Sequence, residues 1–395
     1  MGKIHKSQRR KYEDTMKNLK TQLRLALLPT LILLACTAAY GQVTPSANAH
    51  TSKATITEFD APGAGTGAYQ GTAANDINEK GEITGLYYDE NTVGHGFVRE
   101  PHGKFTSFDA PGAGTGYGQG TNAESINSEG ATTGLYVDGN NVYHSFARAP
   151  NGKFKTFNAK GAGNGANQGT LGENINSSGE IAGYYIDGGN AYHGFVRKPN
   201  GKITTFDAPG AGTGSGQGTL GGSEDCLSPT GWITGGYIDA SNVYHGFVRD
   251  PHGNITSFDA PGAGTGAGQG TQGGGIDPDG KIVGFYADGS NVHHGFLRTR
   301  DGKITTFNVK GAGTGSGQGT LAENINVKGI DGYYVDASSV AHGFLGAHGV
   351  TRFDAPGAGT GSGQGTFIGP NNPANAIAGY YVDGNNVYHG YLRTP

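Results

Sequence analysis

The chain has 395 residues, of which 75 are Gly, 20 Tyr and 17 Phe, and its formal net charge is −4 at neutral pH. A glycine content far above the usual ~7% is typical of low-complexity chains. Here the Gly residues recur at fixed positions beside Tyr, Phe, Ile and Val, which indicates a folded repeat. No basic stripe is present, and this argues against nucleic acid or anionic lipid as a partner, since both are bound through clustered Lys and Arg.

Residues 1–41 have the pattern of a secretory signal peptide. An apolar run from Leu25 to Ala39 follows a basic segment and is too short for a membrane span. Translation from Met16 would give a signal of ordinary length. We therefore expect a bacterial protein that is secreted, periplasmic or held at the cell surface, with no membrane span and with a short linker at 42–54.

The chain contains two cysteines, Cys36 and Cys226. Cys36 falls within the signal, so the mature chain can form no internal disulfide. The sequence before Cys36 also resembles a lipobox, which makes a lipid anchor at Cys36 the alternative to cleavage near Gln42. Removing 1–41 takes away 8 of the 28 Lys and Arg and 2 of the 32 Asp and Glu, and leaves a net charge of about −10.

Seven tandem repeats make up residues 55–395. The Phe of a recurrent Phe-Asp/Asn motif marks each repeat, and successive motifs are 49, 49, 49, 52, 49 and 46 residues apart. These positions are Phe59, Phe108, Phe157, Phe206, Phe258, Phe307 and Phe353. A period of this length indicates one supersecondary unit per repeat.

Each repeat has the pattern of four short strands, as the third repeat illustrates. Its expected strands are 172–176, 180–187, 191–197 and 202–207, which are rich in Tyr, Ile, Phe, Val and Thr. Gly, Asn, Ser and Pro fill the intervening segments, as hairpin turns require. No segment shows helical periodicity.

The phase of the repeat predicts a closed ring. The repeat region opens with a lone fourth strand at 56–60, and the chain ends at Pro395 after the third strand of the last repeat. The N-terminal strand can therefore complete the last unit and cover the sheet edges. Several strands are apolar on both faces, which suits sheets packed between neighbours. We predict an all-β fold, a seven-bladed β-propeller of four-stranded blades closed by the N-terminal strand completing the last blade.

The pattern Ile-Asn-x-x-Gly-x-Ile-x-Gly-Tyr-Tyr followed by His-Gly-Phe-x-Arg resembles the bacterial extracellular HAF-repeat family, named for a His-Ala-Phe tripeptide. The tripeptide is His-Gly-Phe in five repeats and departs to His144-Ser145-Phe146 and His389-Gly390-Tyr391 in the other two. The resemblance covers nearly all of the mature chain. It implies export and a repeat fold, but no catalytic or ligand-binding residue.

Two repetitive loops are expected on one rim and form the candidate binding surface. The loop between the fourth strand and the next first strand carries Gln70, Gln119, Gln168, Gln217, Gln269, Gln318 and Gln364. The turn between the second and third strands carries Asp89, Asp138, Asp187, Asp239, Asp288, Asp336 and Asp383. Amides and carboxylates hydrogen-bond sugar hydroxyls well. The alternative, which we favour, is that Gln satisfies the loop backbone and Asp caps the turn.

Seven histidines recur on the third strand: His95, His144, His193, His245, His294, His342 and His389. A metal would need its ligands within about 2.3 Å, and equivalent positions around a wide ring cannot converge on one ion. We therefore predict structural histidines that hydrogen-bond neighbouring loops, and no metal site.

The fourth repeat departs most from the others and holds Glu224, Asp225, Cys226 and the only Trp, Trp232. Adjacent carboxylates on an extended strand point to opposite sides, which makes a poor acid–base pair. We nominate no catalytic residue and no cofactor. The leading hypothesis is a non-enzymatic exported protein that binds a glycan or another extracellular partner through its rim. The alternatives are a polysaccharide lyase or hydrolase, by analogy of fold alone, and an inert structural surface protein.

Overall fold

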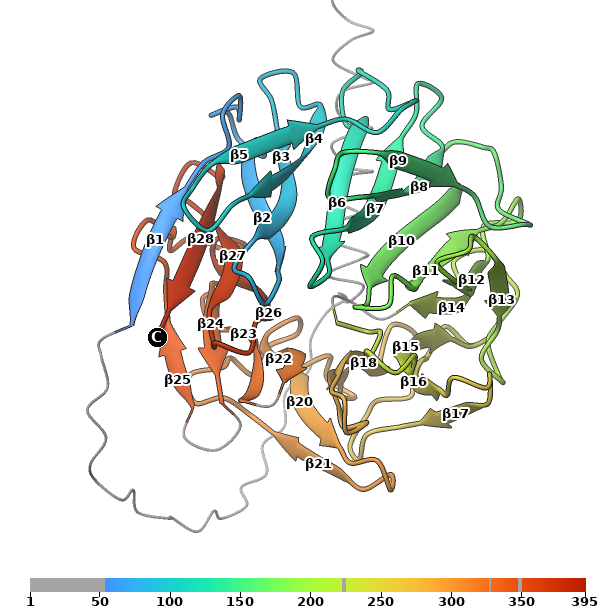
Figure 1. Cartoon of the computed structure of the whole chain (residues 1–395). Coiled ribbons are helices and arrows are strands. Elements are labelled where there is room, and N and C mark those ends of the chain that lie inside the picture. The colour runs from blue at the N-terminus through green and yellow to red at the C-terminus, as the bar shows by residue number, and fades with distance from the viewer. Residues whose placement is uncertain (1–53, 222–224, 327, 347–349) are drawn as a thin grey trace, which may run out of the picture.

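The structure, a computed structural model, describes residues 54–221, 225–326, 328–346 and 350–395. The predicted signal peptide 1–41, with Met16 and Cys36, lies outside the described residues, as does the linker up to residue 53. In the described part of the chain, seven similar units follow one another around a ring (Figure 1). No described helix has the length and apolarity that crossing a membrane would demand.

Each unit contributes three inner strands and one outer strand. The first strands are β2 (Gly71–Ile77), β6 (Gly120–Ile126), β10 (Gly169–Ile175), β14 (Gly218–Gly221), β18 (Gly270–Ile276), β22 (Gly319–Asn326) and β26 (Gly365–Asn371). The second strands are β3 (Ile83–Tyr88), β7 (Thr132–Val137), β11 (Ile181–Ile186), β15 (Ile233–Ile238), β19 (Ile282–Ala287), β23 (Gly329–Val335) and β27 (Ile377–Val382).

The third and outer strands complete the units. The third strands are β4 (Gly94–Arg99), β8 (Tyr143–Arg148), β12 (Tyr192–Arg197), β16 (Tyr244–Arg249), β20 (His293–Arg298), β24 (Ala341–Leu345) and β28 (Tyr388–Thr394). The outer strands are β1 (Thr55–Phe59), β5 (Phe105–Phe108), β9 (Phe154–Phe157), β13 (Ile203–Phe206), β17 (Ile255–Phe258), β21 (Ile304–Phe307) and β25 (Thr351–Phe353). Units one to seven are numbered by their first strands, so β1 is the outer strand of unit seven.

The predicted propeller of seven separate four-stranded blades is wrong. Within a unit the strands pair antiparallel, but each third strand also pairs in parallel with the first strand of the next unit, as β4 does with β6. The three inner strands of every described unit therefore join into one closed, mixed sheet of twenty-one strands, a barrel with seven outer strands attached. Closure was also assigned to the wrong strand, because β2 pairs with β28 and closes the sheet while β1 lies outside it, antiparallel to β28.

The glycine that begins each first strand explains this continuity. Gly120 has φ +111°, and a Cβ at this position would lie 2.1 Å from the carbonyl oxygen of Gly94. Only a residue without a side chain permits this approach and this dihedral angle at low cost. The N–H of Gly94 donates to the carbonyl of the adjacent Gln119 at 2.8 Å. From the sequence this glycine was placed in the loop before the first strand, although it begins that strand.

The core consists of the aromatic residue of each His-x-Phe/Tyr tripeptide together with a second-strand Ile. Phe195 and Ile181 are fully buried in unit three, and their counterparts are equally buried in most other units. Arg249 places its guanidinium 4.9 Å from the ring centroid of Phe206, which belongs to the preceding unit. Similar Arg–Phe contacts recur around the ring, so burial and cation–π attraction hold neighbouring units together.

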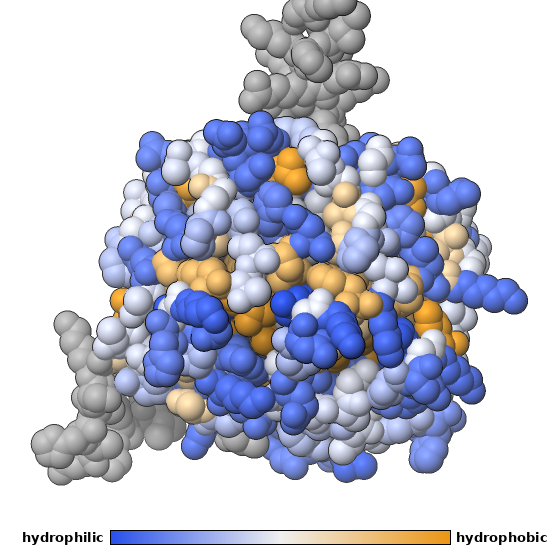
Figure 2. Space-filling view, turned by 45° about the horizontal axis from the view of Figure 1, so that its top comes forward, coloured by the Kyte–Doolittle hydropathy of each residue, from blue (hydrophilic) through white to orange (hydrophobic). Residues whose placement is uncertain are grey.

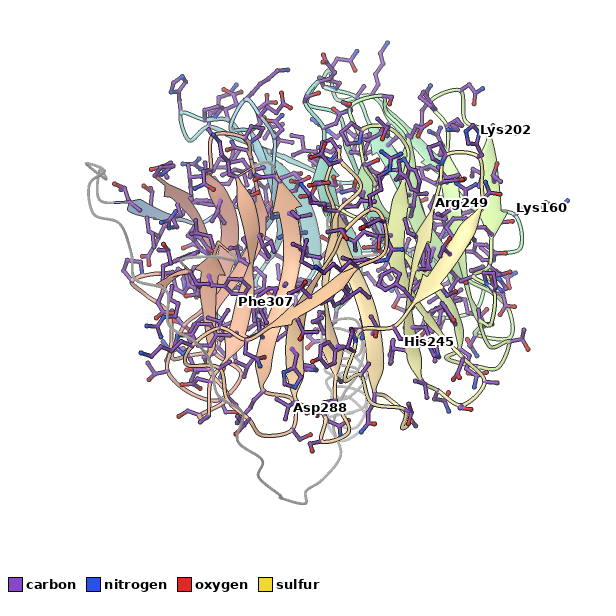
Figure 3. The ribbon with its side chains drawn as sticks, turned by 90° about the horizontal axis from the view of Figure 1, so that it is seen from below. Lys160, Lys202, His245, Arg249, Asp288 and Phe307 are labelled. Carbon is purple, nitrogen blue, oxygen red and sulfur yellow. The ribbon has the colours of Figure 1, made fainter. Side chains whose placement is uncertain are left out.

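The two ends of the ring carry different residues. Figure 3 shows His245 and Asp288 toward one end and Arg249 and Lys202 toward the other. We call the first end the His rim and the second the Arg rim. A band of apolar residues crosses the face shown in Figure 2, and hydrophilic residues lie on both sides of it.

Replacing Gly120 by Ala tests the continuous sheet. We expect a loss of about 3 kcal/mol in unfolding free energy, because the added methyl group would collide with the Gly94 backbone at a dihedral angle that L-residues avoid. Chemical denaturation provides the measurement. Gly139→Ala is the matched control, because a Cβ there meets no atom within 4 Å. An equal, small effect of both variants would contradict the close approach.

Candidate functional site

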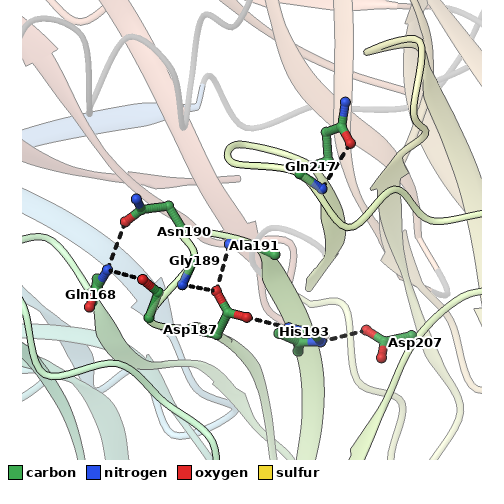
Figure 4. Close-up of polar contacts among 10 residues, drawn as sticks. Gln168, Asp187, Gly189, Asn190, Ala191, His193, Asp207 and Gln217 are labelled. Atoms are coloured by element: carbon green, nitrogen blue, oxygen red, sulfur yellow. Dashed lines mark hydrogen bonds and ion pairs between the residues drawn. The ribbon is translucent and has the colours of Figure 1, made fainter.

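Each unit places one histidine of the His rim between two polar side chains. In unit three, His193 Nδ1 lies 2.9 Å from Asp207 Oδ1, and its Nε2 lies 3.4 Å from Asp187 Oδ2 (Figure 4). Tyr185 stacks on the imidazole with ring centroids 4.8 Å apart. Strand register explains the arrangement, since Gly194 pairs with Phe206 and so brings Asp207 beside His193.

The same set recurs in all seven described units. The Nδ1 contacts are 2.8–3.0 Å, the Nε2 contacts 3.2–3.8 Å and the Tyr–His centroid distances 4.8–5.0 Å. The sets are His95 with Asp89 and Asp109, His144 with Asp138 and Asn158, His193 with Asp187 and Asp207, His245 with Asp239 and Asp259, His294 with Asp288 and Asn308, His342 with Asp336 and Asp354, and His389 with Asp383 and Asp60.

The turn aspartates, predicted as binding residues, also cap their turns. Asp187 Oδ1 accepts the N–H groups of Gly189 and Ala191, each at 2.8 Å. Burial raises the pKa of Asp187, but these backbone donors and His193 outweigh it and hold the pKa below 3.8. The counterparts Asp138, Asp239, Asp336 and Asp383 have lowered pKa values for the same reasons. These carboxylates are therefore ionised at neutral pH.

The rim glutamines brace the long loops. Gln168 Oε1 accepts the N–H of Gly165 at 3.0 Å, and its Nε2 donates to the Gly188 carbonyl and to Asn190 Oδ1. Gln70, Gln119, Gln217, Gln269, Gln318 and Gln364 accept the equivalent glycine N–H. The long loop and the turn thus lie together on the His rim, and Gln joins them. Whether these Gln and Asp residues also bind a ligand stays a prediction.

The chemistry of each set is hydrogen bonding. Both ring nitrogens of His193 face carboxylate oxygens, which are acceptors only, so a ring N–H can donate to either carboxylate. The outer-strand aspartates are about half exposed, with side-chain exposures of 51–56%. Each therefore keeps lone pairs that point to solvent. No group of three or more His, Cys, Asp or Glu in the described residues has the arrangement of a metal site.

Sequence reasoning missed the outer-strand partners of the histidines. Asp60, Asp109, Asn158, Asp207, Asp259, Asn308 and Asp354 follow the Phe that marks each repeat. The recurrent Phe-Asp/Asn motif was the available signal. The motif revealed the period of the repeat. Its Asp or Asn was not recognised as the partner of His, because the two residues lie on adjacent strands and are 12 or more positions apart in the sequence.

No protein-family model matches the chain, and no curated protein matches it. Its fold is similar to that of the BP39L lectin from Burkholderia pseudomallei, with a TM-score of 0.53 at 9% identity over 82% of this chain and 96% of the lectin. A prolyl endopeptidase (TM-score 0.48, 9% identity, 83% of this chain) and puromycin hydrolase (0.46, 12%, 80%) are also similar. This chain spans about half of those two proteins.

The irregular fourth unit builds a core contact rather than an exposed site. Cys226 is fully buried and packs with Leu227, Ile233 and Phe247. Asp225 has φ +61°, and burial followed by the charge of Asp76 raises its pKa to about 8. Glu224 lies outside the described residues. The buried thiol is one of the side chains that join the fourth unit to the third.

A buried carboxyl in unit six replaces a hydroxyl. Thr84 and Thr133, at the same register in units one and two, donate to the carbonyl of the residue thirteen positions later. Asp331 takes this place in unit six, is 0% exposed, and neither of its oxygens has a hydrogen-bond partner among the described residues. An ionised carboxylate cannot donate, whereas a protonated one can donate to the Phe344 carbonyl.

Burial raises the pKa of Asp331 well above 3.8, the neighbouring Asn324 amide lowers it, and the charges of Asp225 and Glu323 raise it further. Its neutral form is therefore favoured in the folded protein. Because the folded state binds this proton more tightly than the unfolded chain, the stabilisation is complete below the unfolded pKa and is lost as pH rises through the folded pKa.

Asp331→Thr should stabilise the protein by about 1–3 kcal/mol at pH above the folded pKa, because a hydroxyl donates at every pH. The gain should shrink as the pH is lowered toward 4. Thermal and chemical unfolding across this pH range provide the measurement. A gain independent of pH would show that the carboxyl does not titrate on unfolding. Asp279→Ala is the control, because this aspartate is 78% exposed.

The glutamine contacts predict a separate effect. Gln168→Ala should lower the unfolding free energy by about 1 kcal/mol, since it removes hydrogen bonds that join two loops. Denaturation and amide hydrogen exchange of the loop from Gly161 to Gln168 would measure it. Unchanged protection of the Gly165 N–H would contradict the bracing role.

Proposed function

We propose that this is a non-enzymatic carbohydrate-binding protein that uses the sevenfold sets of the His rim. The observation that carries the proposal is the repetition of one solvent-facing set, an outer-strand carboxylate or amide held by a histidine that stacks on a tyrosine. Several weak sites on one protein can bind a repeating ligand with high overall affinity, because every contact after the first forms within the same complex. A glycan is a repeating ligand whose hydroxyl groups donate to such acceptors.

Two further observations support the proposal. A lectin is among the solved structures whose fold is similar, and the similarity spans 96% of that protein. The outer-strand aspartates keep oxygens exposed after binding His. The outer-strand carboxylates are also spread over five of seven equivalent positions, with Asn at the other two, rather than gathered into one acid–base pair, which favours binding over hydrolysis.

A secreted or surface-held location is part of this proposal. The signal-like segment 1–41 supports it, and the HAF-repeat resemblance implies the same compartment. N-terminal sequencing and mass spectrometry of protein from the native host would test it, since cleavage near Gln42 and a lipidated Cys36 give different masses. An intact N-terminus would contradict export by this signal.

A glycan array, followed by calorimetry with the best neutral oligosaccharide, tests the binding. We expect several ligands bound per chain. Replacing Asp109, Asp207 and Asp259 together by Ala should lower the stoichiometry by three and leave the affinity of the remaining sites unchanged. Asp279→Ala is the matched control, because it removes an exposed carboxylate that belongs to no His set.

The outcomes separate the competing functions. A stoichiometry of one, unaffected by the triple variant, would place binding elsewhere. Shortening of a polysaccharide on incubation, followed by size-exclusion chromatography, would favour the lyase or hydrolase alternative. Absence of both binding and cleavage would favour the inert surface protein.

A further inference from the structure

The contacts between the outer strands of neighbouring units are not electrostatically equal. Each junction is formed by the loop after one outer strand and the middle of the next outer strand. At the junction of units three and four, Ser257 Oγ donates to the Pro209 carbonyl at 3.5 Å. At the junction of units five and six, Arg352 Nη1 donates to the Lys310 carbonyl at 3.0 Å. The backbone geometry is the same, but the side chains differ.

The junction of units five and six combines two cations. In chain order, which starts with the outer strand of unit seven, the loop positions are Pro62, Pro111, Lys160, Pro209, Pro261, Lys310 and Pro356. The outer-strand positions in the same order are Glu58, Ser107, Thr156, Thr205, Ser257, Thr306 and Arg352. Lysine and arginine coincide at Lys310 and Arg352 alone in this set. Lys160 faces a unit with Thr205, and Pro356 faces Glu58, which accepts the Gly357 N–H.

At the Lys310–Arg352 junction the arginine guanidinium is held against the loop backbone, and both side chains are exposed. A Cβ at Gly311 would lie 3.2 Å from Arg352 Nη1 and 3.5 Å from Tyr334 Oη, so guanidinium, loop backbone and phenol lie together. Both cations are exposed, and no ion pair among the described residues includes either of them. The outer-strand carboxylate of this unit, Asp354, lies 2.8 Å from His342 Nδ1.

The chain's overall acidity does not cancel this local charge. At physiological ionic strength, charges more than about 8 Å apart are largely screened, whereas an arginine fork and a nearby ammonium bind a carboxylate or sulfate through charge-assisted hydrogen bonds. We propose that Lys310 and Arg352 form a subsite for one anionic group, a carboxylate or a sulfate, on an acidic glycan. The inference rests on the proposed glycan binding and adds a substrate class to it.

Each test variant introduces a residue that other units carry at the same position. Lys310→Pro introduces the residue found at five of the seven loop positions, and Arg352→Thr introduces the residue found in units two, three and five. Surface-immobilised polygalacturonate, dextran sulfate and neutral dextran are the probes. They separate a carboxylate from a sulfate, and both from an uncharged glycan.

We expect each variant to weaken binding to the preferred acidic polymer about tenfold, as loss of one charge-assisted hydrogen bond implies. Neutral dextran binding should not change. Lys202→Thr, which removes a positive charge at the Arg rim (Figure 3), and Lys160→Pro, at the junction with one cation, should change affinity less than twofold. Arg352→Glu, which copies Glu58, should weaken binding further, and melting temperatures establish that each variant is folded.

Each result decides the inference. Equal losses in Lys160→Pro or Lys202→Thr would overturn the assignment to the cation pair, as would unchanged binding in folded Arg352→Thr and Arg352→Glu. Binding of neutral glycans without any binding of the acidic polymers would reject the subsite and leave the proposed function intact. No binding of any glycan would reject the proposed function itself.

Discussion

The first strand of each described unit begins at a glycine whose backbone lies against the third strand of the preceding unit, and the rest of the architecture depends on this contact. At Gly71 a Cβ would lie 2.0 Å from the Tyr388 carbonyl oxygen, and the Tyr388 N–H donates to the Gln70 carbonyl at 2.8 Å. The same geometry therefore closes the ring and links its interior units. Because every step repeats one backbone arrangement, a single side chain at any of these glycines would disturb both the pairing and the curvature of the sheet.

The His rim is built directly on this contact. The carbonyl of Gln217 accepts the N–H of Tyr192, while its side chain accepts the N–H of Gly214 and donates to Asn242. One glutamine thus connects the sheet, the long loop and the following turn. The Asp–His sets are fixed from the other side by strand register. Rigid placement lowers the entropic cost of binding, since the groups are ordered before a ligand arrives.

The glycine of the His-Gly-Phe tripeptide has an equally specific cause. A Cβ at Gly194 would lie 2.5 Å from the Phe206 ring, so the absence of a side chain makes room for the aromatic residue of the outer strand. In unit two the residue is Ser145, whose hydroxyl donates to the Thr170 carbonyl and leaves Phe157 packed beside it. Two glycines of the repeat are therefore packing residues. The one that begins the first strand makes room for a neighbouring backbone, and the one in the tripeptide makes room for an aromatic ring.

The local sequence pattern predicted the positions of the strands, but it did not predict the contacts between units. In unit three the expected strands 180–187, 191–197 and 202–207 differ from β11, β12 and β13 by one residue at most ends. The first strand was expected from residue 172 but begins at Gly169. The sequence Asn167-Gln168-Gly169-Thr170 resembles a loop, and nothing in its composition shows that Gly169 pairs with Tyr143 of another unit. The outer-strand partners of His were missed for a different reason, since His193 and Asp207 of one unit become neighbours only through the register of β12 and β13.

Unit six departs from the others at several positions. Arg298 and Arg393 lie over Phe258 and Phe353, but among the described residues no arginine lies over Phe307. The unit also buries the carboxyl of Asp331 where others have a hydroxyl or an apolar side chain, and it carries Arg352 on the rim beside Lys310. Loss of a stabilising contact and burial of a polar group both cost stability. Departures of this kind are expected where function, rather than folding, selects the residues, and the repeated core of the other units can offset their cost. The regular units therefore account for the ring, and the departures of unit six accompany the Lys310–Arg352 pair that we propose as an anionic subsite.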